Sequence, residues 1–455
     1  MWYSSSVVQI SRFGVANRWK LMMTRFQRKL QLGVAFVLMA IVAGLAGCSP
    51  KAEFSANAVL IQKNEDAVDG SIEFSDQRRA DIANALTALF GTPDDPHVPA
   101  AIGISGSDVA QVMDANKIKF AAGPVGSDEQ GRAHGLYREH CAHCHGVTGD
   151  GAGPTASFLN PYPRDFRMGI FKFKSTSKGQ RPTHQDLKQI MVNGIPGTAM
   201  PSFLVLPENE IEALIHYVRY LSVRGEVERL LIDYATYELN PKVEPTESDP
   251  NPTPEDRLVD LTASSEDLET QTEIIRLFVA EVTQKWIDAE SNSTDPTPPD
   301  PDRDLAKSVA HGRELFYGPI ANCVTCHGDS ALGDGQTTDY DDWTKLLEPT
   351  KPELLAKFRK LGALEPRNIH PRNLRLGVYR GGRRPIDLYW RLKNGIDGTP
   401  MPAVWMLPDD AQPGAKGLTE ADLWSLIDYV RNLPYESISN PRLAQPIPNN
   451  QRERS

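Results

Sequence analysis

Apolar residues recur at helical spacing in several separate stretches of the chain. Between Phe74 and Phe90, the apolar side chains Ile82, Leu86 and Leu89 lie on one face of a predicted amphipathic helix. The turn-forming string from residue 91 to residue 96 ends this helix. Residues 48–124, which contain it, are predicted to be a tether followed by a lid or packing extension on the next domain.

A second apolar stripe lies within an acidic, proline-rich part of the chain. It predicts a helix between Leu268 and Ile287, with the apolar face Ile274, Ile275, Phe278, Val279, Val282 and Trp286. Residues 238–304 contain 18 acidic and 5 basic side chains, a net charge of −13, and proline is dense at both ends. Such flanks are stiff and extended. Residues 238–305 are therefore predicted to be a connector that carries one docked helix.

The N-terminal pattern is that of an export signal. A basic region without any acidic residue precedes an apolar stretch of 16 residues, Leu32 to Gly47. The string Leu45-Ala46-Gly47-Cys48 resembles the bacterial lipobox, which implies cleavage of residues 1–47 and lipidation of Cys48. The alternative is an uncleaved membrane span, but a spanning helix needs about 20 residues. The mature chain is expected on the periplasmic side of a bacterial membrane, with inner versus outer membrane left open.

Two copies of Cys-x-x-Cys-His carry the chemistry. They are Cys141-Ala142-His143-Cys144-His145 and Cys323-Val324-Thr325-Cys326-His327. In this motif two thiols can add to the vinyl groups of one porphyrin, and the adjoining His can bind its iron. The sequence therefore predicts two covalently bound haem c groups, with His145 and His327 as proximal ligands. His143 is expected to face solvent or a propionate.

A Cys-x-x-Cys pair has other interpretations: a zinc clamp, a thioredoxin-type redox pair or a structural disulfide. The two pairs together could supply four thiolates to zinc. None of these alternatives explains the His after each pair or the Met-Pro that follows each motif. The chain has 5 Cys, four in the motifs and the fifth at position 48, so no further thiol is left for a disulfide or for catalysis.

An internal repeat indicates two related domains, predicted at residues 125–237 and 306–455. The string of residues 163–172 matches residues 371–380. Each copy then has an Asn-Gly-Ile-x-Gly-Thr-x-Met-Pro loop, ending in Met200-Pro201 and Met401-Pro402. The second copy carries insertions at about 333–366 and 409–418.

These motifs resemble those of class I cytochromes c over about 125–225 and 306–434, and the chain as a whole resembles a di-haem lipoprotein cytochrome c. The resemblance implies an all-α fold with two small helical bundles and little β structure. In each bundle an N-terminal helix runs into the motif and a C-terminal helix crosses it. An aromatic side chain of the last helix then packs on a glycine of the first, Tyr217 on Gly135 and Tyr429 on Gly312.

Met200 and Met401 are the expected distal ligands, because a thioether suits haem iron and both Met occupy the same place in the repeated loop. Met191 and Met406 are interpreted as core filling. The resemblance makes the Pro154 carbonyl the hydrogen-bond acceptor for the proximal His145, and no acceptor is identified in the second copy. Arg164 and Arg372 are possible propionate contacts, since a guanidinium fork fits a carboxylate. The run from Arg380 to Arg384 is expected to be a solvated loop, with docking of an acidic partner as the alternative.

A formal net charge of −10 argues against nucleic-acid binding. The resemblance predicts a lipid-anchored respiratory cytochrome that carries single electrons to or from redox partners, which are a quinol-oxidising complex, an oxidase or a small cytochrome. The first rival is a di-haem peroxidase, which needs an open sixth iron position and distal acid–base groups. A second rival is a structural or sensory haem lipoprotein.

Overall fold

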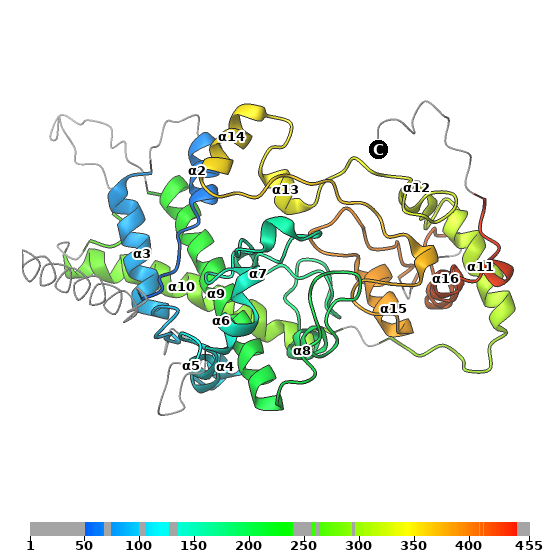
Figure 1. Ribbon diagram of the computed structural model, residues 1–455, viewed down its shortest axis with the longest axis horizontal. Helices are drawn as coiled ribbons and strands as arrows, with labels where there is room; N and C mark the ends of the chain where they lie inside the picture. Colours follow the sequence, from blue (N-terminus) through cyan, green and yellow to red (C-terminus); the bar gives the residue numbers. More distant parts are fainter. Residues whose placement is uncertain are drawn as a thin grey trace, which may run out of the picture. The chain divides into compact units, whose positions relative to one another are not determined.

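The computed structural model describes residues 51–67, 74–99, 106–126, 135–239, 257–260, 264–293, 296–408, 410–412 and 414–443. Cys48 and the predicted signal peptide lie outside these residues. Within them the regular structure is helical, with isolated β-bridges and no strand, which confirms the all-α prediction (Figure 1). None of the described helices is long and apolar enough to cross a membrane.

The long helix α9 (Glu208–Tyr237) is the centre of the first half of the chain. Four N-terminal helices pack against it: α2 (Ala58–Ala67), α3 (Asp76–Phe90), α4 (Gly106–Val112) and α5 (Ala115–Ala121). The predicted amphipathic helix is α3, which Ser75 caps at its N-terminus and which buries Ile82, Leu86 and Phe90. In its described parts, the N-terminal region is therefore a packing extension that shares the core of α9.

The connector contributes α10 (Ser265–Ser291), which packs on α9 and α4 (Figure 1). Trp286 is fully buried, and its indole N–H donates to Oε1 of Glu226 on α9 at 3.0 Å. Ile275, Val279 and Val282 are buried on the same face. The predicted docked helix is confirmed, and the surface that it needed is the long helix of the first domain.

The first cytochrome-like region holds three further helices, α6 (Leu136–His140), α7 (Ala142–His145) and α8 (His184–Asn193). The packing of Tyr217 on Gly135 stays a prediction. Gly135 has φ +67 and caps α6, and a Cβ there would lie 2.4 Å from the carbonyl oxygen of Pro124. The ring of Tyr217 contacts that of Tyr137, with 4.8 Å between centroids. The chain at Pro124 and Val125 thus packs directly on Gly135.

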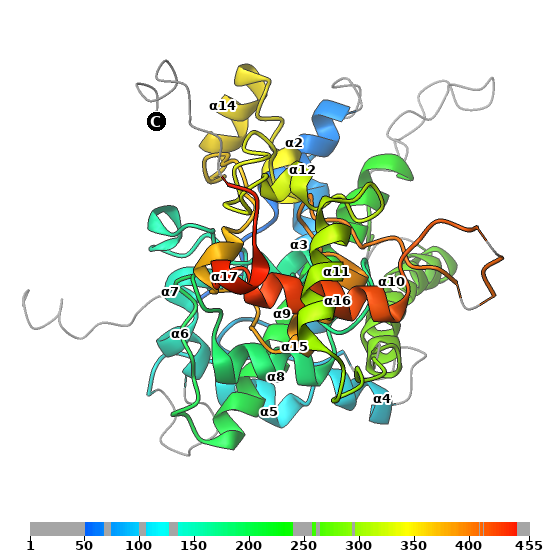
Figure 2. The same cartoon turned by 90° about the vertical axis from the view of Figure 1, so that its right-hand side faces the viewer.

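The second region follows the predicted plan more closely. Its helices are α11 (Leu305–Tyr317), α12 (Val324–His327), α13 (Asp342–Leu346), α14 (Pro352–Lys360), α15 (Pro385–Asn394), α16 (Glu420–Asn432) and α17 (Glu436–Ser439). Figure 2 shows α11 crossing α16. At the crossing, a Cβ on Gly312 would lie 1.9 Å from the Ser425 carbonyl oxygen and 2.8 Å from Cβ of Tyr429. Only glycine permits this approach, which confirms the predicted contact between Gly312 and Tyr429.

Candidate functional site

Each Cys-x-x-Cys-His motif forms one helical turn, α7 in the first domain and α12 in the second. The backbone N–H of His145 donates to the carbonyl of Cys141 at 2.9 Å, and His327 repeats this bond to Cys323 at 2.9 Å. The turn brings both thiols and the imidazole of each motif together. His143 is exposed, as expected for a position between the two thiols.

The alternative chemistries for these cysteines do not fit. Cys141, Cys144, Cys323 and Cys326 are all free thiols, so neither pair is a disulfide. Among the described residues, three or more possible metal-ligand atoms converge only at His184, Glu212 and His216, and no cysteine is part of that group. The two pairs therefore do not form a four-thiolate zinc site.

A backbone carbonyl orients each proximal histidine. Nδ1 of His145 donates to the carbonyl of Arg164 at 3.0 Å, and Nδ1 of His327 donates to the carbonyl of Arg372 at 3.2 Å. The expected acceptor Pro154 is therefore wrong, and the acceptor missing from the second copy is Arg372. With the proton on Nδ1, each ring has its Nε2 lone pair free for iron.

The proximal rings are neutral at pH 7. Burial lowers the pKa of His145 to about 4, although the hydrogen bond to Arg164 opposes the shift. Burial also lowers the pKa of His327. Phe166 stacks on the His145 ring at 4.5 Å between centroids and holds its plane. Neutral imidazole is the form that binds a metal.

The two Met loops have the same hydrogen bonds. Ile195 N–H donates to the Met200 carbonyl at 3.1 Å, and Met200 N–H donates to Oγ1 of Thr198 at 3.1 Å. In the second loop, both equivalent distances are 3.2 Å, from Ile396 to Met401 and from Met401 to Thr399. The threonine hydroxyl donates to the isoleucine carbonyl at 2.8 Å in both loops. The Gly-Thr-x-Met string thus folds into one rigid turn that presents the methionine.

In the first domain the two halves of the site enclose one cavity. Cys141, Cys144, His145 and Met200 all line it. Its other walls are mostly apolar and include Phe166, Phe171, Leu187, Met191, Phe203, Ile215 and Val218. Two thiols, an imidazole and a thioether around an apolar space are the groups that a covalent His/Met haem needs. The residues therefore fit haem c, with Met191 as part of the apolar wall.

The corresponding groups of the second domain share one hydrophobic cluster. Cys323, Met401 and Met406 pack against its buried core, which contains Phe316, Leu388 and Leu426. The ring centroids of Phe316 and His327 lie 6.4 Å apart. The donor set and its apolar surroundings match those of the first domain.

The two arginines proposed for propionate contact have different positions. The half-buried Arg164 guanidinium lies 3.7 Å from the ring centroid of Trp343 and lines the first cavity. Nε of Arg372 donates to the carbonyl of Val378 at 2.8 Å, and its guanidinium lies beside Gly197 of the first Met loop. Propionate contact stays a prediction for both.

Three residues of the first cavity region were given no place in the haem site from the sequence. Lys172 and Arg380 line the cavity, and Trp343 stacks on Arg164. Lys172 and Arg380 occupy matching places in the repeated string, a signal that could have identified them. The expectation of a solvated loop is therefore wrong for Arg380. It holds for Arg383, which is exposed.

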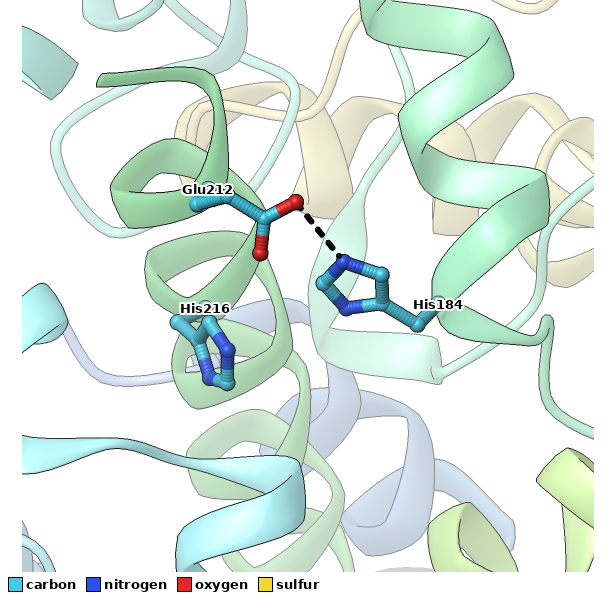
Figure 3. A group of neighbouring side chains, drawn as sticks. All are labelled: His184, Glu212 and His216. Carbon is cyan, nitrogen blue, oxygen red and sulfur yellow. Dashed lines mark hydrogen bonds and ion pairs between the residues drawn. The ribbon is translucent and has the colours of Figure 1, made fainter. Parts of the chain in front are cut away.

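A second polar cluster lies between α8 and α9 (Figure 3). Nε2 of His184 lies 3.1 Å from Oε1 of Glu212, and Nζ of Lys117 lies 3.3 Å from Oε2 of the same carboxylate. Burial raises the pKa of Glu212, but His184 and Lys117 outweigh it and hold the pKa at about 2. The backbone N–H of Asp114 donates to Nδ1 of His216 at 3.1 Å, and Nε2 of the same ring lies 3.3 Å from Nζ of Lys117. Both ring nitrogens of His216 therefore already face hydrogen-bond donors, and we assign the cluster to ion pairing.

The comparison with protein-family models agrees with this chemistry. The cytochrome c family model matches residues 131–222 and 309–434. None of the curated proteins matches the chain. A similar solved structure is a chain of the Kuenenia stuttgartiensis reducing HAO-like protein complex, with 22% identity, a TM-score of 0.39, and coverage of 66% of this chain and 94% of that chain. Two regions of the chain are therefore cytochrome c domains, and such domains imply covalently bound haem c.

Proposed function

We propose that the chain is a membrane-anchored, periplasmic di-haem cytochrome c that carries single electrons in a respiratory chain. The observation that carries this proposal is the duplicated donor set. Each domain combines a Cys-x-x-Cys-His turn with an identically hydrogen-bonded Met loop. A haem with two protein ligands on its iron has no free coordination position, which suits electron transfer rather than substrate chemistry.

The residues of each domain have separate tasks in this function. The cysteines fix the cofactor, and the carbonyls of Arg164 and Arg372 orient the proximal imidazoles. The Met loops supply the second ligand, and the apolar walls exclude water. Haem supplies an iron that gains and loses one electron; the protein sets the potential and the access to it.

The partners and location belong to the same proposal. A lipid on Cys48 would hold the domains at a membrane. A quinol-oxidising complex is proposed as donor, and a terminal oxidase or a small cytochrome as acceptor. The chain would act between them or as a subunit of one.

Carbon monoxide separates this function from a peroxidase. The purified, reduced protein should show two reversible one-electron components in a redox titration and little spectral change with carbon monoxide at pH 7. Both results follow if His145/Met200 and His327/Met401 fill the axial positions. Ready carbon monoxide binding at one haem together with peroxide turnover would overturn the proposal in favour of the peroxidase.

Anchoring needs its own experiment. Labelled fatty acid should enter the wild-type protein in a bacterial host and should not enter Cys48→Ala, which should also accumulate at the higher mass of the unprocessed chain. Cys144→Ala is the matched control, because it removes a motif thiol and leaves the lipobox intact. An unlipidated mature protein that begins elsewhere would contradict the anchor and leave the haem chemistry untouched.

A further inference from the structure

A loop of the second domain lies against the haem cavity of the first. The loop runs from Tyr379 to Gly382, and Gly381 sits on the ring of Phe173, where a Cβ would lie 2.4 Å from Cδ1. Phe173 itself lines the first cavity. Gly381 has φ +81, so both its conformation and this close approach favour glycine.

The second domain holds this loop firmly. The Tyr379 hydroxyl donates to the carbonyl of Val430 at 2.6 Å, and the carbonyl of Leu374 lies 3.2 Å from the same oxygen. Arg391 on α15 donates to the carbonyl of Arg380 at 2.5 Å and to that of Gly382. The backbone of Arg380 is therefore fixed by its own domain, while its side chain lines the cavity of the other.

Direct contacts also fix the two domains to each other at this place. Nζ of Lys174 lies 2.9 Å from Oδ2 of Asp397, and these side chains are only 4% and 6% exposed. The amide of Asn394 donates to the Ser175 carbonyl at 3.1 Å. Residues 173–175 thus connect the wall of the first cavity to the second domain, so the position of Arg380 is defined relative to that cavity.

The Arg380 guanidinium has no partner of its own. Its Nε is buried without a hydrogen bond, and none of the described carboxylates forms an ion pair with it. Lys172 and Arg164 line the same cavity, and among the described residues their only side-chain partner is Trp343. Nζ of Lys172 lies 5.9 Å from the centroid of the Trp343 ring, and Cζ of Arg164 lies 3.7 Å from it. Three cations therefore border one cavity without a paired anion.

Without an anion, the surroundings of these three side chains disfavour their charged forms. Burial, followed by the charges of Arg164 and Arg380, lowers the pKa of Lys172 to about 7, and Asp341 and Asp342 only partly offset this. Burial lowers the pKa of Arg164 to about 10 and also lowers that of Arg380. Buried charges are normally paired. An anion in the cavity would offset the free-energy cost of burying these charges, and the two propionates of a haem supply two carboxylates.

We propose that Arg380 of the second domain, together with Arg164 and Lys172, binds the propionates of the haem in the first domain. The first haem site is then complete only in the presence of the second domain. This inference rests on the proposed function in one respect, the attachment of haem to Cys141 and Cys144. The repeated string explains its origin, since Lys172 and Arg380 are equivalent residues that converge on one cavity.

The test is a redox titration of the full two-haem protein carrying Arg380→Gln. A cation beside the propionates favours the reduced state, so its loss should make reduction of the first haem about fivefold less favourable, about 40 mV at 59 mV per tenfold for one electron. The component that Met200→Ala displaces identifies the first haem. Arg380→Lys keeps the charge, so the potential of the first haem should stay close to its wild-type value.

Arg383→Gln is the matched control, because it removes the same charge three residues further along the chain, at an exposed position. It should leave both components unchanged. If Arg380→Gln does not accumulate as a folded protein, Lys172→Gln tests the same site from the first domain and should shift the same component downward.

Two outcomes would overturn the assignment of Arg380: an unchanged first component, or a shift confined to the second. An unchanged first component in Lys172→Gln would overturn the cation site as well. Absence of haem stain or of reversible redox chemistry in the wild type would instead count against the proposed function. The two failures are therefore distinguishable.

Discussion

At the scale of single residues, the most informative contacts are the carbonyls that orient the proximal histidines. Arg164 and Arg372 stand 19 and 45 residues after the histidines that they hold. The spacing differs because the second copy carries an insertion, yet both acceptors occupy the same place in the repeated string. The backbone of that string, rather than its side chain, performs the role common to both domains.

The distal ligands can be tested one at a time. Met200→Ala and Met401→Ala should each open one iron, lower the potential of that haem and create carbon monoxide binding, because the thioether stabilises the reduced state and fills the sixth position. Haem staining should persist, since the thioether bonds of the cysteines do not depend on methionine. Spectra and redox titrations of the reduced proteins measure both effects.

Met191→Leu and Met406→Leu are the controls for this prediction. Both methionines contribute to apolar packing, and leucine conserves that role at a cost below about 1.5 kcal/mol. If Met200→Ala changed neither potential while Met191→Leu did, Met191 would be the ligand of the first domain.

The buried His216 predicts a pH dependence of stability. Burial lowers its pKa to about 4, and Lys117, Arg219 and His184 add to the shift. The unfolded chain takes up a proton near pH 6.5 that the folded chain refuses, so the free energy of unfolding should fall between pH 6.5 and 4. His216→Gln should remove up to about 3 kcal/mol of this dependence, at about 1.4 kcal/mol per pH unit.

Denaturant unfolding at a series of pH values checks the His216 prediction. His97→Gln is the control, because its side chain is 55% exposed and lies at the surface. It should keep the wild-type pH profile. Identical profiles for His216→Gln and wild type would show that another group dominates this range.

At the scale of elements, α9 has two functions. Its N-terminal half crosses the first haem domain and lines the cavity with Ile215 and Val218. Its C-terminal half receives α2, α3 and α10. Glu226 on this helix accepts from Trp286 at 3.0 Å and pairs with Arg181, so one buried carboxylate bonds both to the connector helix and to Arg181.

The docking of α10 predicts a large effect for one substitution. Trp286→Ala removes a fully buried side chain and should cost about 3–5 kcal/mol, with detachment of the connector helix. Thermal unfolding and the rate of proteolysis within residues 257–293 measure the effect. Leu277→Ala on the same helix is the matched control, because Leu277 is 56% exposed and should be nearly neutral. Equal protease sensitivity of the two variants would contradict the docked position.

At the scale of the whole molecule, the number of haems is the simplest prediction. The pair Cys141→Ser/Cys144→Ser and the pair Cys323→Ser/Cys326→Ser should each retain half of the wild-type haem stain and one redox component. Each motif contains every residue that its own covalent attachment needs. A wild-type protein that binds zinc and shows no haem absorbance would contradict the entire assignment.

The two sites are nevertheless not independent. Arg372 of the second domain lies beside Gly197 of the first Met loop, and a Cβ on Gly398 of the second Met loop would lie 2.2 Å from the ring of Trp343, which stacks on Arg164. Each Met loop thus contacts the repeated string of the other domain (residues 163–172 or 371–380). The contact is direct in one case and passes through Trp343 in the other.

The sequence by itself determined the helical class, the docked connector helix, the haem motifs and the Met loops. Each of these depends on local spacing: a helical period, a thiol pair next to a histidine, or a glycine–threonine turn. Such spacing acts over a few residues, so it survives in any tertiary arrangement.

Only the tertiary structure decided the remaining features. The carbonyl of Arg164, the backbone of Pro124 over Gly135, and the placement of Arg380 in the cavity of the other domain all join residues distant in the chain. A local sequence pattern does not determine which distant group packs against a given residue, because that depends on how whole elements and domains pack together. The repeat made Lys172 and Arg380 equivalent in sequence, and packing of the two domains brought both to the same haem cavity.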